Sequence, residues 1–242
     1  MLILLASERD EQARALATRY ARKGLRMLIP ANLSRPGWRW RNADPRGTVA
    51  QIDGERVLAN EIGGVITRLP WVLPCDLPDI QACEQEYVAA EINAFLLAWL
   101  VSLDCPLLNR PSAQCLSGQG WRSQKWVSKA CELGIPARAV HQSISLRARL
   151  AVHETEPQDA ITLTVVGNHV VGTGNAVLKR YASRLAAAAN VQLLSVRFDS
   201  AARHAILLGA SLWPDLSDPD VGEAIWDHFQ DPATRQRAAV AQ

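Results

Sequence analysis

The spacing of apolar residues near the start of the chain predicts a strand, a helix and a second strand. Residues 1–6 form a continuous apolar run and residues 25–31 form another, as in buried parallel strands. The segment between them carries apolar residues at helical spacing, namely Ala13, Leu16, Ala17 and Tyr20. Ser7 and Asp10 have the spacing of a capping box at its start, and Gly24 marks its end. The order predicts a right-handed βαβ unit.

The alternation of strands and helices continues to about residue 110. We expect a hairpin around Asp53-Gly54, a strand over 63–70, a helix over 79–103 and a short strand at 107–108. The buried face of that long helix is assigned to Tyr87, Ala90, Ala94, Leu97, Leu100 and Val101. The pattern predicts a Rossmann-like α/β domain with a mostly parallel sheet over residues 1–111.

The pattern changes in the second half, which we assign to a reduced α+β lobe over residues 112–242. A helix over 122–133, stopped by Gly134 and Pro136, precedes an alternating strand over 143–152. The elements expected after it are a hairpin from 161–166 and 169–171, a helix over 177–189, strands over 191–198 and 204–210, and a helix over 221–229 with Trp226 on its inner face.

Composition excludes several classes of function. The net charge of +2 gives no electrostatic argument for nucleic acid or for an acidic membrane surface. The apolar run over 94–101 lies too close to Glu91 and Asp104 to span a membrane. The first strand is followed by no G-x-G-x-x-G, so no dinucleotide fingerprint is present.

The cysteines and histidines carry no recognisable chemical motif. Five cysteines without a C-x-x-C pair predict reduced, mostly buried thiols in a cytoplasmic protein. No histidine lies near a cysteine in sequence as a base would, which argues against a catalytic thiol. The histidines lack metal-ligand spacing, so we expect no metal from them.

Tryptophan is unusually abundant, with eight residues against three phenylalanines. Trp38 and Trp40 alternate with arginines over residues 35–41, a composition typical of partner-binding surfaces. The simpler interpretation, which we favour, is that these rings cover a sheet edge. Arg147 and Arg149 on the predicted strand over 143–152 are either solvated or a docking face for an acidic peptide.

Polar residues at the ends of the predicted parallel strands form a second set of candidates. Open parallel sheets bind ligands beyond the carboxyl ends of their strands. The candidates there are Arg68, Glu91, Asn109 and Arg110, which an unrelated α/β enzyme would also use. The structural alternative is that Arg68 and Arg110 form ion pairs with Glu86 or Glu91.

Four segments in the first 136 residues together resemble the ATP-grasp ligases that modify ribosomal peptides, the microviridin type. They are the strand Val65-Ile66-Thr67-Arg68-Leu69-Pro70, the helix start Tyr87-Val88-Ala89-Ala90-Glu91, the strand end Leu107-Leu108-Asn109-Arg110-Pro111, and the helix end Ala130-Cys131-Glu132-Leu133-Gly134-Ile135-Pro136. The resemblance implies a pre-ATP-grasp domain followed by a nucleotide-binding lobe. It also implies ATP and Mg²⁺ as cofactors and an acyl phosphate as intermediate.

The second half departs from that family where the chemistry is done. The resemblance places the first phosphate-binding lysine at Arg122 or Ser123, with Lys125 two residues later. It places the family's hairpin arginine at Thr162 or Thr164. Its metal ligands, an Asp and a Glu-x-Asn, fall on Arg197, Gly209 and Ser211, and the nearby Asp199 and Asp215 are candidates for displaced ligands.

Two functional hypotheses follow from the resemblance. The first is a non-catalytic recognition or partner subunit, without cofactor, in a peptide-modification or natural-product pathway. The second is a diverged ATP-dependent ligase that uses Arg122, Lys125, Asp199 and Asp215 with ATP and Mg²⁺. Both imply a protein or peptide partner. The sequence leaves open whether the chain forms a homo-oligomer.

Overall fold

The computed structural model describes residues 1–41, 47–138, 157–234 and 236. The chain forms two units, Met1–Gly120 together with the chain from Asp215 onward, and Trp121–Pro214. This division differs from the expected boundary after residue 111, because the chain returns to the first unit for its last helix. That helix buries Ile225 and Phe229 there. The expected strand over 143–152, with Arg147 and Arg149, lies outside the described residues.

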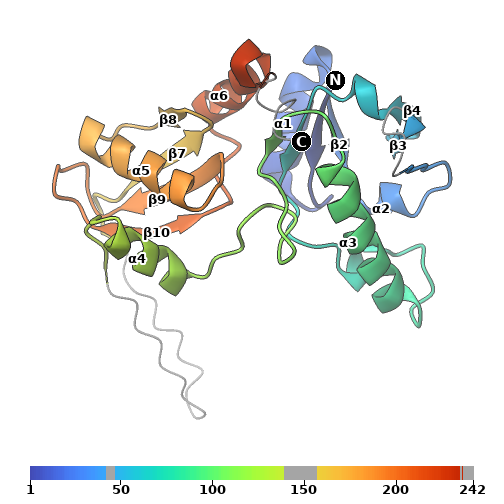
Figure 1. Ribbon diagram of the computed structural model, residues 1–242, viewed down its shortest axis with the longest axis horizontal. Helices are drawn as coiled ribbons and strands as arrows, with labels where there is room; N and C mark the ends of the chain where they lie inside the picture. The colour runs from blue at the N-terminus through green and yellow to red at the C-terminus, as the bar shows by residue number, and fades with distance from the viewer. Residues whose placement is uncertain (42–46, 139–156, 235, 237–242) are drawn as a thin grey trace, which may run out of the picture. The chain divides into compact units, whose positions relative to one another are not determined.

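The first unit is built on a parallel sheet, as expected from its apolar runs. Its strands are β1 (Leu2–Leu5), β2 (Leu25–Leu28), β5 (Gly64–Thr67) and β6 (Leu107–Leu108), in the order β2-β1-β5-β6 (Figure 1). The expected hairpin is present as β3 (Val49–Ile52) and β4 (Glu55–Leu58). Asp53 and Gly54 both have positive φ angles, 52° and 81°, as this tight turn requires.

Helices cover both faces of the parallel sheet. The long helix α3 (Gln85–Val101) packs on the face that carries Ile3, Leu5 and Val65. On the opposite face, Phe229 of α6 (Pro219–Gln230) approaches Gly64, and α6 packs against α1 (Glu11–Tyr20). The short helices of this unit are η1 (Ala21–Lys23), α2 (Pro30–Leu33), η3 (Ala59–Glu61) and η4 (Pro74–Asp76).

The start of α1 differs from the expected capping box. Asp10 is the N-cap residue, and its carboxylate accepts a hydrogen bond from the backbone N–H of Ala13 at 3.0 Å. Ser7 lies three residues earlier, where its hydroxyl oxygen accepts the N–H of Arg9 at 3.3 Å. An aspartate is as good an N-cap as a serine, so spacing alone did not decide between them.

The buried face of α3 was assigned wrongly. The residues that face the core are Ala89, Ile92, Leu96, Trp99 and Leu100. Tyr87 and Val101, both expected inside, are 70% and 53% exposed. Of the six residues expected to be buried, only Leu100 is. The helix is apolar on both sides, so periodicity did not identify the side that faces the sheet.

The second unit is a four-stranded antiparallel sheet covered by two helices. The strands are β7 (Ile161–Val166), β8 (His169–Val171), β9 (Leu193–Phe198) and β10 (Leu207–Ser211), in the order β10-β9-β7-β8. The helices α4 (Ser123–Glu132) and α5 (Ala176–Ala188) pack on one face. Leu163, Val165, Leu194 and Val196 point from the strands into that core. No described helix is long and apolar enough to cross a membrane.

Candidate functional site

The most organised polar cluster of the first unit lies at the carboxyl edge of its parallel sheet. The strand order places β1 between β2 and β5, so the chain reverses direction across the sheet between β1 and β5. Such a switch point is where open α/β sheets bind ligands. Arg68 follows β5 directly, and its backbone N–H donates to the carbonyl oxygen of Leu5 at the end of β1, at 2.8 Å.

The Arg68 guanidinium is held by the start of α1. Its Nε donates to Oδ2 of Asp10 at 2.6 Å, and its Nη2 donates to Oε1 of Gln12 at 2.8 Å. Only 8% of the Arg68 surface is exposed. The ion pair therefore joins Arg68 to Asp10, where the sequence had suggested Glu86 or Glu91.

The segment that leads into α6 reaches the same cluster. Gln12 Oε1 also accepts the backbone N–H of Leu216 at 3.3 Å. The Asp215 carboxylate accepts the hydroxyl and the N–H of Ser217, and these bonds, together with the charge of Arg68, lower the pKa of Asp215 below its ordinary value. Arg68 therefore organises three segments of the first unit that are distant in sequence.

Asn109 is a buried structural residue at the neighbouring strand end. Its backbone N–H donates to Oγ1 of Thr67 at 2.8 Å, and its side-chain amide donates to the carbonyl oxygen of Ser117 at 3.2 Å. With 1% of its surface exposed, Asn109 is oriented by the loop that follows it. Arg110, the next residue, is exposed. Glu91 is exposed on α3.

Trp38 and Trp40 have different environments. Trp38 is half-buried, donates its indole N–H to the carbonyl oxygen of Asn32 at 2.9 Å, and meets the rings of Phe95 and Trp99 edge to face. Trp40 remains 37% exposed and meets the ring of Phe95 edge to face, at a ring-centroid distance of 6.4 Å. Trp38 therefore covers the core, while Trp40 presents apolar surface to solvent.

The candidate phosphate-binding residues share the first turn of α4. Arg122 is the N-cap residue, and the N–H of Lys125 donates to its carbonyl oxygen at 2.9 Å. Both side chains are exposed. The Lys125 ammonium lies 5.7 Å from the ring centre of Trp121, a cation–π contact.

The positions that the resemblance assigns to hairpin arginine and metal ligands lie together on one face of the second sheet. Strand pairing aligns Thr162, Arg197 and Gly209 in one row. It aligns Thr164, Ser195 and Ser211 in the next. Directly paired residues point to the same side of a sheet, and this side is opposite to the core packed by α4 and α5. The row that crosses this face has an arginine at its centre.

The two aspartates considered as displaced metal ligands are engaged elsewhere. Oδ1 of Asp199 accepts the N–H of Ile206 at 2.9 Å and the hydroxyl of Ser200 at 3.2 Å, which closes the loop between β9 and β10. Asp215 belongs to the first unit. Among the described residues, no three His, Cys, Asp or Glu side chains gather as metal ligands would.

The thiols are less buried than the sequence suggested. All five cysteines are free, but only Cys105 and Cys115 are buried. Cys75, Cys83 and Cys131 are exposed.

Several residues of the Arg68 cluster were not singled out from the sequence as parts of a site. Asp10 carried a helix-start signal that did not indicate its second role as the partner of an arginine. Gln12 and Ser217 carried no signal, because only the return of the chain to the first unit brings their segments together.

Comparison with solved structures identifies the fold. The chain superposes on the macrocyclase MdnB from Microcystis aeruginosa MRC with a TM-score of 0.65 and 13% identity, over 94% of this chain and 98% of that one. The macrocyclase MdnC bound with precursor peptide MdnA, from the same organism, gives 0.65 and 11% over 95% and 99%. The ATP-grasp ligase PsnB complexed with minimal precursor, Mg and ADP gives 0.62 and 11% over 95% and 98%.

No family model and no curated protein matches the chain in sequence. The superpositions alone show that the chain has the fold of the peptide-modifying ATP-grasp ligases, as its sequence resemblance indicated.

Proposed function

We propose that this chain is an ATP-grasp-like protein without the usual ATP and magnesium site, and that it acts as a non-catalytic recognition or partner subunit in a peptide-modification pathway. The observation that carries the proposal is the row Thr162, Arg197 and Gly209 on the face of the second sheet opposite to the α4 and α5 core. The family resemblance places a metal-binding aspartate at Arg197, a metal-binding glutamate at Gly209, and an arginine at Thr162 or at Thr164 of the next row.

The residues present do not fit Mg²⁺. Magnesium needs hard oxygen ligands in near-octahedral array, and it neutralises the phosphate charge in phosphoryl transfer. Gly209 offers no side chain, Ser211 offers a neutral hydroxyl, and Arg197 offers a fixed positive charge that repels the ion. Asp199 is committed to its own loop. We therefore derive no phosphoryl-transfer step for this chain.

The second hypothesis is a diverged ligase that clamps phosphate with Arg122 and Lys125. Both are exposed cations in one helical turn, which supports weak anion binding there. An acyl-phosphate mechanism also needs neutralisation of charge on the transferring phosphoryl group. The described residues offer no cluster of acids for a metal to serve that purpose. Cations that could bind phosphate, without acids that could bind a metal, favour a recognition function over catalysis.

A peptide is the partner class that the fold supports best. The solved structures of MdnC and PsnB hold precursor peptides. A chain that keeps this fold but lacks the magnesium ligands retains a scaffold suited to peptide recognition. We therefore propose that it binds a peptide or the enzyme that modifies one.

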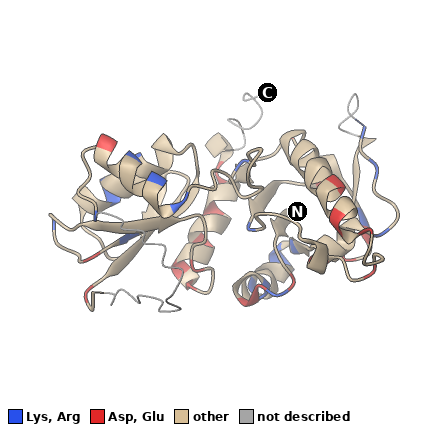
Figure 2. Cartoon of the chain, turned by 90° about the horizontal axis from the view of Figure 1, so that it is seen from below, with Lys and Arg blue, Asp and Glu red and all other residues tan. Residues whose placement is uncertain are grey.

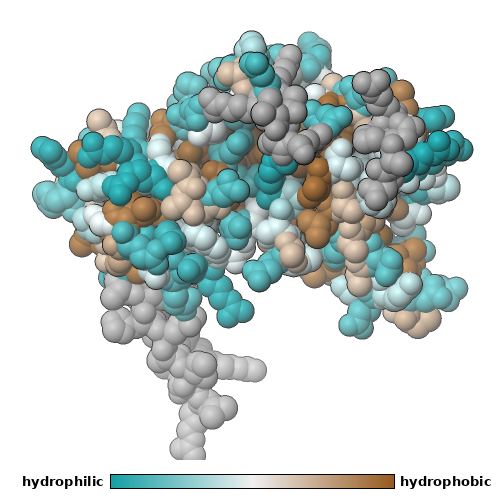
Figure 3. Space-filling model, viewed as in Figure 1, coloured by the Kyte–Doolittle hydropathy of each residue, from teal (hydrophilic) through white to brown (hydrophobic). Residues whose placement is uncertain are grey.

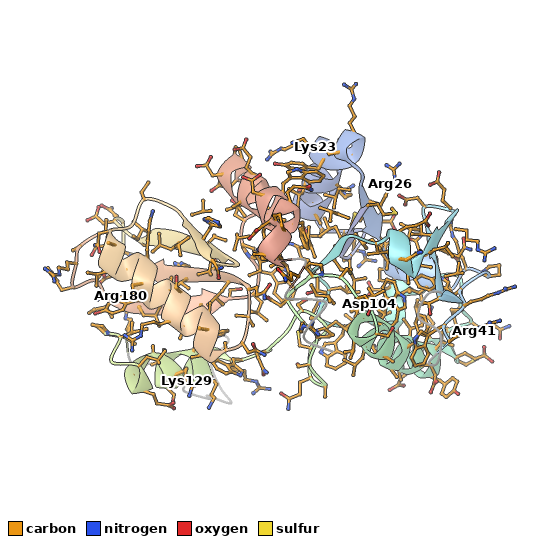
Figure 4. The ribbon with its side chains drawn as sticks, turned by 45° about the horizontal axis from the view of Figure 1, so that its top comes forward. Lys23, Arg26, Arg41, Asp104, Lys129 and Arg180 are labelled. Atoms are coloured by element: carbon orange, nitrogen blue, oxygen red, sulfur yellow. The ribbon has the colours of Figure 1, made fainter. Side chains whose placement is uncertain are left out.

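Isothermal titration with ATP and Mg²⁺ tests the proposal. We expect no binding heat at millimolar nucleotide from the natural chain. The triple variant Arg197→Asp, Gly209→Glu and Ser211→Asn rebuilds the acidic set, so it should gain Mg²⁺-dependent nucleotide binding. Arg180→Asp on the outer surface of α5 is the matched control for the charge change (Figure 4).

Magnesium-dependent binding of ATP by the natural chain would contradict the proposal. Binding of ATP by the natural chain with a dissociation constant below about 1 mM, about −4 kcal/mol, and only with Mg²⁺ present, would establish the diverged ligase. Fluorescence anisotropy with the peptides encoded beside its gene then tests the partner class. Absence of binding to any of them would remove peptide recognition.

A further inference from the structure

The charge of the chain is divided unevenly between its two units. The second unit, Trp121–Pro214, contains eleven lysine and arginine residues and five aspartate and glutamate residues. The rest of the chain contains fifteen basic and nineteen acidic residues. The net charge of +2 therefore combines +6 in the second unit with −4 in the first. Such asymmetry within one chain indicates a surface for an oppositely charged partner.

The cations of the second unit gather on its two helices. Both helices cover the same face of the sheet, and Nη2 of Arg184 on α5 donates to the carbonyl oxygen of Leu133 at the end of α4, at 2.8 Å. Figure 2 shows lysine and arginine segments on the helices of this unit. We call this surface the α4–α5 face, and its cations are Arg122, Lys125, Lys129, Lys179, Arg180 and Arg184.

Acidic residues neutralise little of the α4–α5 face. Glu132 is the one acid on α4 or α5, and it forms an ion pair with Lys129. The other described acids of this unit lie outside the two helices, at Asp159 before β7 and at Asp199 in the loop after β9. Six cations and one acid leave a surplus of positive charge. An ammonium group has three donors and a guanidinium five, so Lys129 and Arg184 also keep donors for a partner.

We propose that the α4–α5 face binds an acidic peptide segment. Lys125 and Lys129 are one helical turn apart, and so are Arg180 and Arg184, which spaces each pair by about 6 Å along its helix. Alternate side chains of an extended peptide are about 6.6 Å apart. Acidic residues at every second position of such a peptide therefore match either pair of cations. This inference rests on the proposed function, which makes the partner a polypeptide.

The neutral residues of the face favour a peptide over a single-stranded nucleic acid or a membrane. Near its cations α5 exposes Ala187 and Ala188, and Ser183 is half-buried. Proteins that bind single strands stack the bases on accessible aromatic rings, but Trp126 is buried and Tyr181 is half-buried. Helices that bind membranes carry bulky apolar anchors, which these small residues do not supply. Figure 3 shows hydrophilic side chains among smaller apolar patches over α5.

Fluorescence anisotropy with a labelled peptide of alternating glutamate and serine tests the proposal. We expect this peptide to bind, and a peptide with glutamine in place of glutamate not to bind. The double variant Lys125→Glu with Arg180→Glu should weaken binding about tenfold or more, because two attractions become repulsions. A higher salt concentration should weaken the binding too, since exposed charges are screened.

The matched control is the double variant Arg22→Glu with Arg56→Glu, at two exposed positions of the first unit. Its net charge equals that of Lys125→Glu with Arg180→Glu, so it should bind the peptide nearly as the natural chain does. Lys125→Gln with Arg180→Gln removes charge without reversing it and should have intermediate affinity. Thermal unfolding of each variant checks that the fold is kept. Arg184 is left unchanged because it also bonds to α4.

No binding of the acidic peptide, or equal weakening by the control variant, would overturn the proposal. So would tighter binding of duplex DNA, or of vesicles that contain phosphatidylserine, if Lys125→Glu with Arg180→Glu abolishes it. The proposed function is tested separately. Magnesium-dependent binding of ATP would overturn the non-catalytic role and leave the α4–α5 face in place. Binding of precursor peptides that this double variant does not weaken would keep the proposed function and overturn this site.

Discussion

Two of the five cysteine thiols, those of Cys105 and Cys115, are buried in the core of the first unit. Burial lowers their reactivity. Burial raises the pKa of Cys105 to about 12, with a further increase from the carboxylate of Asp104. Burial also raises the pKa of Cys115. Because the thiolate is the reactive form, both residues are protected twice, by steric exclusion and by protonation.

A thiol titration with Ellman's reagent at pH 8 checks this. We expect fast reaction of Cys75, Cys83 and Cys131, and reaction of Cys105 and Cys115 only after denaturant is added. Raising the pH to 9 should leave Cys105 slow, because its raised pKa keeps it protonated. Five fast thiols in the native protein would contradict the burial of Cys105 and Cys115.

The positions of Arg68 and Asn109 at strand ends were predictable at the residue scale, but their partners were not. The end of a strand is visible in the sequence where an apolar run gives way to a polar residue. Both residues lie at the strand ends where they were expected. The partner of Arg68 is Asp10, which is 58 positions away. Contacts between residues so far apart in sequence depend on the order of the strands in the sheet. The identity of a single residue does not predict that order.

Helix α6 is attached to the first unit through a close approach at Gly64. The ring of Phe229 is fully buried against β5, and a side-chain carbon at Gly64 would overlap it. Tyr20 of α1 stacks on Trp226 at 5.4 Å, which fixes the other side of the helix. These contacts explain why α6 belongs to the first unit.

The substitution Gly64→Ala should therefore destabilise the first unit by about 1–3 kcal/mol through overpacking. In a Phe229→Ala background, itself expected to cost about 3–5 kcal/mol, the added methyl group should cost less because the ring is gone. Urea denaturation of the two single variants and the double variant measures this coupling. Additive effects would show that Phe229 does not contact Gly64.

Most elements were predictable from sequence because their apolar patterns are simple. The hairpin over 161–171 has the expected bounds, since Gly167-Asn168 gives an unambiguous turn. The orientation of α3 was predicted wrongly because Tyr87, Ala94 and Val101 form as regular an apolar stripe as the true core residues. Periodicity detects an apolar face, but it does not say whether the sheet or another molecule covers it.

At the scale of the whole molecule, the first unit is discontinuous in sequence. The chain leaves it after Gly120, forms the second unit, and returns at Asp215. The return was not predictable, because the helix over 219–230 has an ordinary amphipathic pattern that fits either unit. The positions that the resemblance assigns to the metal ligands could be chosen only through that resemblance, since nothing local in Arg197 or Gly209 points to metal binding.

Ending the chain at Pro214 should therefore unfold the first unit and spare the second. The truncation removes Val221, Ile225 and Phe229, each worth about 1.5–3 kcal/mol of burial, against a typical domain stability of 5–15 kcal/mol. Limited proteolysis followed by mass spectrometry measures it. Residues 1–120 should be cleaved rapidly, while a fragment of 121–214 should resist. Equal resistance of both units would show that α6 is dispensable.

The return of α6 also dictates the order of events during synthesis. When residue 120 leaves the ribosome, β5 still lacks its cover from α6, and 109 further residues (229 minus 120) must be translated before Phe229 reaches Gly64. At typical translation rates of about 5–20 residues per second this delay lasts several seconds. During this interval the second unit can form first, so the part of the chain that is made earliest completes its folding last.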